Sequence, residues 1–277
     1  MIRGTTALVA HIGYPTDGFM SPMIYNPYFE DAGIDAVVVP MSCGPQHLPS
    51  LLHAVFTLTN VRGALITMPH KVATVELLDE ASSAVRIAGS CNAVRRGADG
   101  RLEGELFDGE GFVRALRRNG CSIERARALV VGAGGVGSAI AASLAAAGAA
   151  AIALFDTRAG AAVALADRLA THYAGLELTT GSADPIGYDI VVNATPWGTS
   201  DSDAMPVDPE RIDRDAFVGD VVLSGAVTPF IRAARARGCR TQVGADMLFE
   251  QIPAYLEFFG FPTTTPEHLR RIAHDVW

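Results

Sequence analysis

A glycine-rich turn is the first candidate for ligand chemistry in this sequence. The strand-like run 127–131 leads into Gly132-Ala-Gly-Gly-Val-Gly137, and an alanine-rich helical pattern follows. In this setting GxGxxG is typical of dinucleotide binding, because the glycines allow a tight turn and let a pyrophosphate approach the backbone at a helix N-terminus. We therefore expect five residues to hold a dinucleotide: Gly132, Gly134, Gly135, Val136 and Gly137.

An acidic residue stands where such a turn needs one. Asp156 closes the next strand-like run, 151–155, nineteen residues beyond Gly137. A carboxylate there accepts hydrogen bonds from the ribose hydroxyls of NAD and repels the extra phosphate of NADP. Arg158 follows two residues later and could pair with that phosphate. We expect NAD as the cofactor, with both residues at its ribose, and NADP stays possible.

A second loop follows another predicted strand. Asn193-Ala-Thr-Pro-Trp-Gly-Thr199 comes directly after 190–193. Ligands of open α/β sheets bind beyond the carboxyl ends of the strands, so we expect Asn193, Thr195 and Pro196 to lie near the nicotinamide. An ordinary Pro/Gly turn without a ligand is the alternative.

Further segments, in chain order, resemble one family. They are Gly13-Tyr-Pro15, Ser21-Pro22, Asn26, Thr67-Met-Pro-His-Lys71, Gly89-Ser-Cys-Asn92, Gly104, Asp108-Gly-Glu-Gly-Phe112, the glycine-rich turn, the 193–198 loop, Thr228-Pro229 and Gly244-Ala-Asp-Met-Leu-Phe-Glu-Gln251. Together they cover nearly the whole chain, and the sequence is similar to the shikimate and quinate dehydrogenases.

The resemblance implies an NAD(P)-dependent oxidoreductase that moves hydride reversibly between the nicotinamide and a ring hydroxyl of shikimate, quinate or a related cyclic hydroxy acid. It places Lys71 and Asp108 at the reacting hydroxyl. Oxidation of a secondary alcohol needs a group that takes the hydroxyl proton, and an amine or a carboxylate can do so. The sequence leaves open which of the two moves it. A solvated surface lysine and a helix-capping aspartate are the structural alternatives.

The resemblance also implies the residues that surround the substrate. Asn92 and Gln251 would orient the ring hydroxyls, Ser21 and Thr67 would contact the substrate, and Gly244 would lie beside the cofactor. Ordinary polar packing is the alternative for the two amides.

The substrate segment departs from the family pattern on its carboxylate side. Where the family has two serines that hold the carboxylate, preceded by a histidine, this chain reads Gly18-Phe-Met-Ser21, so Phe19 replaces one serine. Leu223 stands at the position of a tyrosine, and Leu106-Phe107 replaces Asn-Thr before Asp108. We expect a relative of shikimate or quinate with a changed carboxyl-side group. A non-catalytic NAD-binding sensor is the alternative function, and a lysine enzyme that uses a folate carbon carrier is a weaker one.

The elements that must position these residues alternate between two kinds. Short β-branched runs are separated by helical patterns at 7–12, 36–40, 63–67, 128–131, 151–155, 190–193 and 217–223. Apolar runs without polar alternation suit strands covered on both faces by helices, which predicts an α/β protein with parallel sheets.

Two composition changes predict the domain boundaries. Asp108-Gly-Glu-Gly111 opens a helix that leads into a fresh strand, and only helical patterns follow Gln242-Val-Gly244. We predict an α/β substrate-binding catalytic domain of residues 1–108, completed by the helices of 243–277. Residues 109–242 would form a Rossmann-type NAD-binding domain with a doubly wound parallel sheet.

The composition excludes several classes of partner. Hydrophobic residues make up 49% of the 277 residues, and the net charge is −8 with no basic cluster. Nucleic acid and anionic membrane are therefore poor partners, and an anionic substrate must be captured by local donors. The longest apolar stretch, 139–154, is too short and glycine-rich to span a membrane. We expect a cytoplasmic monomer or homodimer.

The cysteines and histidines predict no metal. Cys43, Cys91, Cys121 and Cys239 are far apart in the sequence and form no CxxC pair, so we expect buried thiols. His70 is expected to complete the turn that carries Lys71, and His11 has no acidic partner at metal-ligand spacing.

Overall fold

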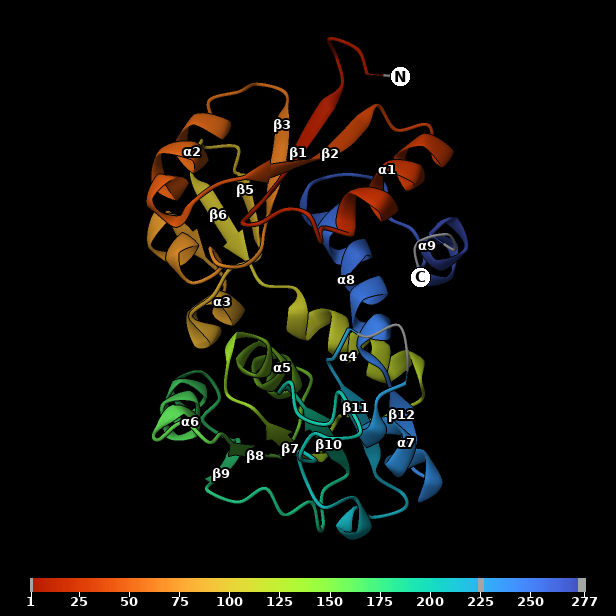
Figure 1. The fold of residues 1–277 in the computed structure, drawn as a ribbon. Coiled ribbons are helices and arrows are strands. Elements are labelled where there is room, and N and C mark those ends of the chain that lie inside the picture. The colour runs from red at the N-terminus through yellow and green to blue at the C-terminus, as the bar shows by residue number, and fades with distance from the viewer. Residues whose placement is uncertain (1, 224–226, 274–277) are drawn as a thin grey trace. The chain divides into compact units, whose positions relative to one another are not determined.

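The structure is a computed structural model that describes residues 2–223 and 227–273 (Figure 1). By its internal contacts the chain forms two compact units. Met1–Phe107 and Ile252–Trp277 make the first, and Asp108–Gln251 makes the second. Each unit is an α/β structure with its own sheet, and this confirms the predicted fold class.

The first unit contains six strands and several short helices. Its strands are β1 (Ala7–Gly13), β2 (Ala36–Ser42), β3 (Val61–Ile66), β4 (Glu80–Ala81), β5 (Ala93–Arg96) and β6 (Leu102–Glu105). Its helices are α1 (Ser21–Asp31), α2 (Leu48–Val55), α3 (Ser83–Ala88), α9 (Pro266–Ile272) and the end of α8 (Gly244–Phe258), with the short 3-10 turns Pro45–His47 and Ala73–Leu77.

The first sheet has the strand order β2-β1-β3-β5-β6-β4. β1 lies between β2 and β3 and pairs with both in parallel. After β1 the chain turns to β2 on one side of the sheet, and after β3 it continues toward the other side. The space beyond the carboxyl ends of β1 and β3 therefore stays open between the two connections. Each connection therefore emerges at the same carboxyl edge.

The prediction of parallel strands was wrong for part of this sheet. β5 pairs antiparallel with both β3 and β6. β5 and β6 are each four residues long, and a turn around Gly97–Gly100 joins them. A connection this short can join only antiparallel neighbours. Their shortness and their arginine and glutamate side chains hid them from a search for apolar runs.

Two contacts fix the helices of this unit on the sheet. Asn26 of α1 accepts a hydrogen bond from the Val38 backbone N–H at 2.7 Å and donates to its carbonyl at 3.1 Å, so one side chain joins helix to strand. Gly63 of β3 is pressed against Phe259, since a Cβ there would lie 2.3 Å from the ring. The C-terminal segment is therefore part of this unit's core.

The second unit is a single parallel sheet of the doubly wound kind. Its strands are β7 (Arg127–Val131), β8 (Ala151–Phe155), β9 (Glu177–Thr180), β10 (Ile190–Asn193), β11 (Phe217–Asp220) and β12 (Arg240–Gln242). The order is β12-β11-β10-β7-β8-β9. Strand order reverses between β7 and β10, which makes their carboxyl ends the switch point at which such sheets bind ligands.

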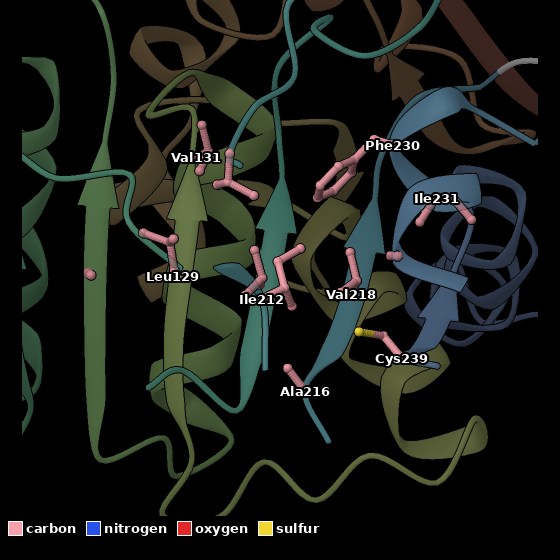
Figure 2. Close-up of a cluster of buried hydrophobic side chains, with 12 residues drawn as sticks. Leu129, Val131, Ile212, Ala216, Val218, Phe230, Ile231 and Cys239 are labelled. Atoms are coloured by element: carbon pink, nitrogen blue, oxygen red, sulfur yellow. The ribbon is translucent and has the colours of Figure 1, made fainter. Parts of the chain in front are cut away.

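Helices and a buried cluster cover this sheet. The helices are α4 (Asp108–Arg118), α5 (Gly135–Ala146), α6 (Ala161–His172), α7 (Pro229–Ala236) and the first part of α8, with the 3-10 turn Pro209–Arg211. Figure 2 shows side chains of β7 and β11 meeting Phe230 and Ile231 of α7 over one face of the sheet. The cluster spans Leu129 to Cys239 and fixes the strands whose ends carry the loops described below.

Most predicted elements are present, with shifted ends. Each of the seven apolar runs is a strand, but the run 217–223 ends as a strand at Asp220. The helix that Asp108-Gly-Glu-Gly111 was predicted to open begins at Asp108 itself. Only helices follow Gln242 in the described residues, and residues 243–251 pack with the second unit. No helix in the described ranges combines the length and the apolarity needed to cross a bilayer.

Candidate active site

The glycine-rich turn after β7 is sterically restricted to glycine at two positions. Gly132 has φ +106°, and a Cβ there would lie 2.6 Å from the Ala194 carbonyl oxygen. A Cβ at Gly137 would lie 1.9 Å from the Gly132 carbonyl oxygen, so the start of α5 touches the end of β7. Gly134 has no such neighbour, and the nearest atom is Arg158 Nη2 at 3.9 Å. Space therefore remains beside Gly134 for a ligand.

The helix that follows presents its N-terminus at this turn. α5 begins at Gly135, which is exposed, and Val136 beside it is half-buried. The first N–H groups of a helix have no acceptor within it, and with the helix dipole they favour an anion. The turn and the helix start can together accept a pyrophosphate.

Asp156 connects the end of β8 to this turn. Its carboxylate accepts hydrogen bonds from the Ala133 N–H at 2.7 Å and from the Arg158 N–H at 2.8 Å. The Arg158 guanidinium adds two more, from Nε at 3.0 Å and from Nη2 at 2.9 Å. These bonds, those of the guanidinium first, hold the pKa of Asp156 well below its usual range. The carboxylate is thus ionised and fixed, while the arginine side chain stays 65% exposed.

A pocket opens at the switch point of the second sheet. It measures about 320 Å³ and lies at the carboxyl ends of β7, β8 and β10. Its lining combines the glycine-rich turn, the Asp156–Arg158 segment and the loop after β10: Val131, Gly132, Gly134, Phe155, Asp156, Thr157, Arg158, Ala194, Thr195, Pro196 and Trp197. Three segments far apart in the sequence, each predicted to contact a dinucleotide, therefore line one cavity.

Asn193 shapes the loop after β10 from a buried position. Its amide donates to the Trp197 carbonyl at 2.8 Å, and its Oδ1 accepts from the Thr195 hydroxyl at 2.7 Å and from the Thr195 N–H at 3.1 Å. The side chain is fully buried. These partners occupy the amide, so Asn193 fixes the loop, whereas Thr195 and Pro196 line the pocket.

Asp220 is a buried carboxylate at the end of β11 that the sequence reasoning missed. It accepts from Asn193 Nδ2 at 3.2 Å, from the Val222 N–H at 3.0 Å and from the Thr228 hydroxyl at 2.7 Å. Burial raises its pKa from the ordinary value. The Val222 bond turns the chain away from the sheet, which explains why the strand ends here. An acidic residue inside an otherwise apolar strand-like run is the signal that could have found it.

The remaining predicted cofactor residue begins α8. A Cβ on Gly244 would lie 2.4 Å from the Val222 carbonyl oxygen, so the helix start is pressed against the segment after β11. Leu223, next in that segment, is 52% exposed. Glycine at 244 is thus a packing requirement beside the Asp220 network.

Lys71 and Asn92 lie on neighbouring segments of the first unit. The Cys91 N–H donates to the Lys71 carbonyl at 2.8 Å, and the Ile66 N–H donates to the Asn92 carbonyl at 2.9 Å. Lys71 follows the carboxyl end of β3, and Asn92 lies beside that end. His70 is buried, and its Nε2 lies 2.7 Å from the Cys43 carbonyl oxygen. This contact fixes the turn that carries Lys71, where the sequence predicted a turn-forming role for His70.

Asn92 has one free donor in a buried position. It is 1% exposed, and its Oδ1 accepts from the Phe107 N–H at 3.0 Å. Its Nδ2 has no hydrogen-bond partner among the residues that the structure describes. A buried amide donor without a partner costs free energy on the order of 1–3 kcal/mol, so a ligand oxygen is its natural acceptor.

The substrate segment after β1 surrounds Gly13. A Cβ on Gly13 would lie 2.5 Å from Phe19 Cζ and 2.5 Å from Thr67 Cγ2, so the ring of Phe19 and the side chain of Thr67 meet at this edge. Phe19 also stacks on His11 with ring centroids 4.0 Å apart. Ser21 is half-buried at the first position of α1.

Asp108 and Gln251 lie on two helices that cross within the second unit. Asp108 is the first residue of α4 and is 6% exposed. One turn later, a Cβ on Gly111 would lie 2.3 Å from Gln251 Cγ on α8. Gln251 is also 6% exposed. Lys71 belongs to the first unit and Asp108 to the second, and their joint action stays a prediction.

Neither the cysteines nor any acidic cluster forms a metal site in the described ranges. No group of three or more His, Cys, Asp or Glu side chains in these ranges is placed to hold an ion. The four cysteines are buried and reduced, and burial raises the pKa of Cys91 to about 12.

Comparison with known proteins identifies the family. Residues 11–94 match the shikimate dehydrogenase substrate binding domain, and residues 114–158 match the ThiF family. A shikimate dehydrogenase (NADP(+)) of Rubrobacter xylanophilus is 36% identical over 254 residues, which cover 90% of this chain and 89% of that protein. The chain belongs to the shikimate dehydrogenase family.

Two solved structures show the same fold over the whole chain. The Listeria monocytogenes shikimate 5-dehydrogenase in complex with shikimate and NAD is 25% identical, with a TM-score of 0.91 over 98% of this chain and 97% of that one. The ligand-free 5-ketofructose reductase of Gluconobacter sp. strain CHM43 is 27% identical, with a TM-score of 0.89 over 98% and 99%. The chain is thus an oxidoreductase of this family that uses a nicotinamide cofactor.

Removing the Asp220 carboxylate should disorder the cofactor loop. Asp220→Ala leaves the buried donors of Asn193 and Thr228 and the half-buried Val222 N–H without this acceptor. We therefore expect cofactor binding to weaken about tenfold or more, at about 1.4 kcal/mol per factor of ten. Titration of NADH fluorescence measures the dissociation constant. Asp215→Ala, an exposed aspartate before the same strand, is the control. An unchanged dissociation constant in Asp220→Ala would disprove the positioning role.

His11 should make the folded state sensitive to acid. Burial lowers its pKa from 6.5 to about 4, so between these values the unfolded chain takes up a proton that the folded chain refuses. Stability is therefore complete above pH 6.5 and is lost as the pH falls toward 4, by about 3 kcal/mol. Urea unfolding at several pH values, compared with His11→Asn, isolates this contribution. Equal pH dependence in both proteins would contradict the assignment.

Proposed function

We propose that this protein oxidises a ring hydroxyl of shikimate, quinate or a related cyclic hydroxy acid and reduces the corresponding ketone in reverse, with NAD as the preferred cofactor. The cofactor, when bound, takes up or gives back the hydride. The pocket at the switch point of the second sheet supports this proposal. Asn92 Nδ2 beside the Lys71 turn also supports it, since this donor has no acceptor within the described ranges.

The observation that carries the proposal is the identity of residue 71. Of the 22 Lys and Arg residues, 21 are arginine, and Lys71 is the one lysine in the chain. Surface cations elsewhere in this protein are arginines, which do not release a proton in proteins. An amine that can exchange its proton is thus retained at one position, the one that resembles the family's catalytic lysine.

Lys71 and Asp108 together act on the proton of the reacting hydroxyl. During oxidation the hydroxyl proton passes to this pair while the hydride leaves the same carbon, and reduction returns the proton to the new alkoxide. Asn92 Nδ2 donates to a ring oxygen, and Gln251 holds a second hydroxyl. Thr67 and Ser21 contact the ring from the edge of the first sheet.

The cofactor preference rests on the Asp156–Arg158 pair. The Rubrobacter xylanophilus relative is named for NADP, whereas the Listeria monocytogenes enzyme was solved in complex with NAD. In this chain the carboxylate at the ribose position is ionised, and it holds the neighbouring guanidinium through two hydrogen bonds. A 2′-phosphate would have to separate this pair and lie beside the carboxylate, whereas ribose hydroxyls can donate to it.

Replacing the single lysine by arginine should abolish turnover while it keeps the charge. We expect Lys71→Arg to lower kcat by about 100-fold or more, because proton transfer contributes that much in general acid–base catalysis. KM for the ring substrate should change less. Reduced-nicotinamide absorbance measures both with shikimate and quinate. Arg62→Lys, the reverse exchange at an exposed site, should behave as wild type.

Two other results would be informative. Near wild-type turnover by Lys71→Arg would remove Lys71 from the chemistry. Firm NAD binding without turnover of any cyclic hydroxy acid would favour the alternative of a non-catalytic nucleotide sensor.

Removing the Asp156 carboxylate should shift the cofactor preference. In Asp156→Ser the guanidinium of Arg158 is released and the repulsion of the phosphate disappears, so the ratio of kcat/KM for NADP over NAD should rise about tenfold or more. The double variant Asp156→Ser/Arg158→Ala should lose that gain, which separates the two causes. A wild-type enzyme that prefers NADP would contradict the assignment.

A further inference from the structure

The ring of Phe19 occupies the edge of the first sheet at which the proposed substrate lies. Its tip meets Thr67 above Gly13, between the ends of β1 and β3. A turn holds the ring there, since the Phe19 N–H donates to the Thr16 carbonyl at 3.0 Å. A substrate that contacts Thr67 at this edge must also contact the ring.

The imidazole of His11 stacks on the Phe19 ring, and its buried Nδ1 has no hydrogen-bond partner among the described residues. The two rings are stacked, 26° from parallel, and His11 is 7% exposed. Burial lowers the pKa of His11 to about 4, so the imidazole is uncharged near neutral pH. The aromatic pair thus brings no positive charge to this edge of the sheet.

Cations that could bind a carboxylate are scarce around this pair. Residues 4–61, which include β1, α1, β2 and α2, contain no lysine or arginine. Arg62 is the second residue of β3, at the end of the strand away from Thr67, and Arg95 pairs with Glu103. Lys71, in the turn after Thr67, is assigned to the reacting hydroxyl. The hydroxyls of Thr67 and Ser21 are neutral donors, and they stabilise a carboxylate less than charged groups do.

We propose that the Phe19–His11 pair selects a substrate with an uncharged group at this end: a neutral polyhydroxylated ring alcohol, or its ketone, in preference to the matching carboxylate. The inference rests on the proposed hydride transfer at the same site. The C–H face of such a ring packs against Phe19 through dispersion, and the neutral hydroxyls satisfy its oxygen atoms.

A matched pair of substrates tests the selection. Shikimate and its methyl ester share one ring and one reacting hydroxyl and differ in charge at one end. Wild-type enzyme should show a kcat/KM for the ester at least about tenfold above that for the acid. Phe19→Ser, which offers a hydroxyl to the carboxylate, should lower this ratio about tenfold or more, whereas Phe19→Leu, which stays apolar, should keep it.

The outcomes separate this inference from the proposed function. A wild-type preference for the acid, or equal shifts in Phe19→Ser and Phe19→Leu, would overturn the selection and leave the dehydrogenase intact. If neither compound is oxidised, turnover of quinate and other cyclic hydroxy acids decides the proposed function. Calorimetric titration of both compounds into the NAD-loaded protein then still decides the selection, since tighter binding of the ester supports it and tighter binding of the acid refutes it.

Discussion

The open carboxyl edge between two parallel strands is the constraint on which the rest of this structure depends. This point lies between β1 and β3 in the first unit, where the chain leaves for β2 on one side and for β4 on the other. In the second unit it lies between β7 and β10, where the strand order reverses. Connections on the two sides of such a point leave in opposite directions, so loops meet a ligand there without covering it. The Lys71 turn and the Phe19 turn follow one pair of strands, and the glycine-rich turn and the Asn193 loop follow the other.

Close backbone contacts and buried polar groups keep these edges in shape. At the second edge, Gly132 and Gly137 allow β7, α5 and the loop after β10 to touch. Asp220 accepts hydrogen bonds from Asn193, Val222 and Thr228. These bonds fix the loops that follow β10 and β11. Its burial disfavours the charged form, yet three hydrogen bonds oppose that effect. Gly137 and Asp220 thus shape the cofactor pocket without lining it.

Charge is distributed sparingly around the site. The net charge of −8 gives no long-range attraction to an anion, and the chain contains a single lysine. Arg158 is neutralised by Asp156, and the aromatic pair of Phe19 and His11 is uncharged. Recognition must therefore come from short-range hydrogen bonds and packing, which favours ligands rich in hydroxyl groups.

Local sequence determined much of this protein. The period of the apolar runs gave the central strands of both sheets, and the glycine spacing with Asp156 gave the three segments that line one pocket. The sequence also recorded, in its composition, that lysine occurs at one position. These signals are local because backbone sterics and strand burial act on neighbouring residues.

The tertiary structure alone decided the rest. It ended β11 at Asp220, paired the short polar strands β5 and β6 antiparallel, and turned Asn193 inward to its loop. It also left Asn92 Nδ2 without an acceptor in the described part of the chain. It also stacked Phe19 on a histidine eight residues away. Each of these outcomes depends on partners distant in sequence or on the path of a loop, and side-chain hydrogen bonds and ring contacts form only after the sheet has brought those partners together.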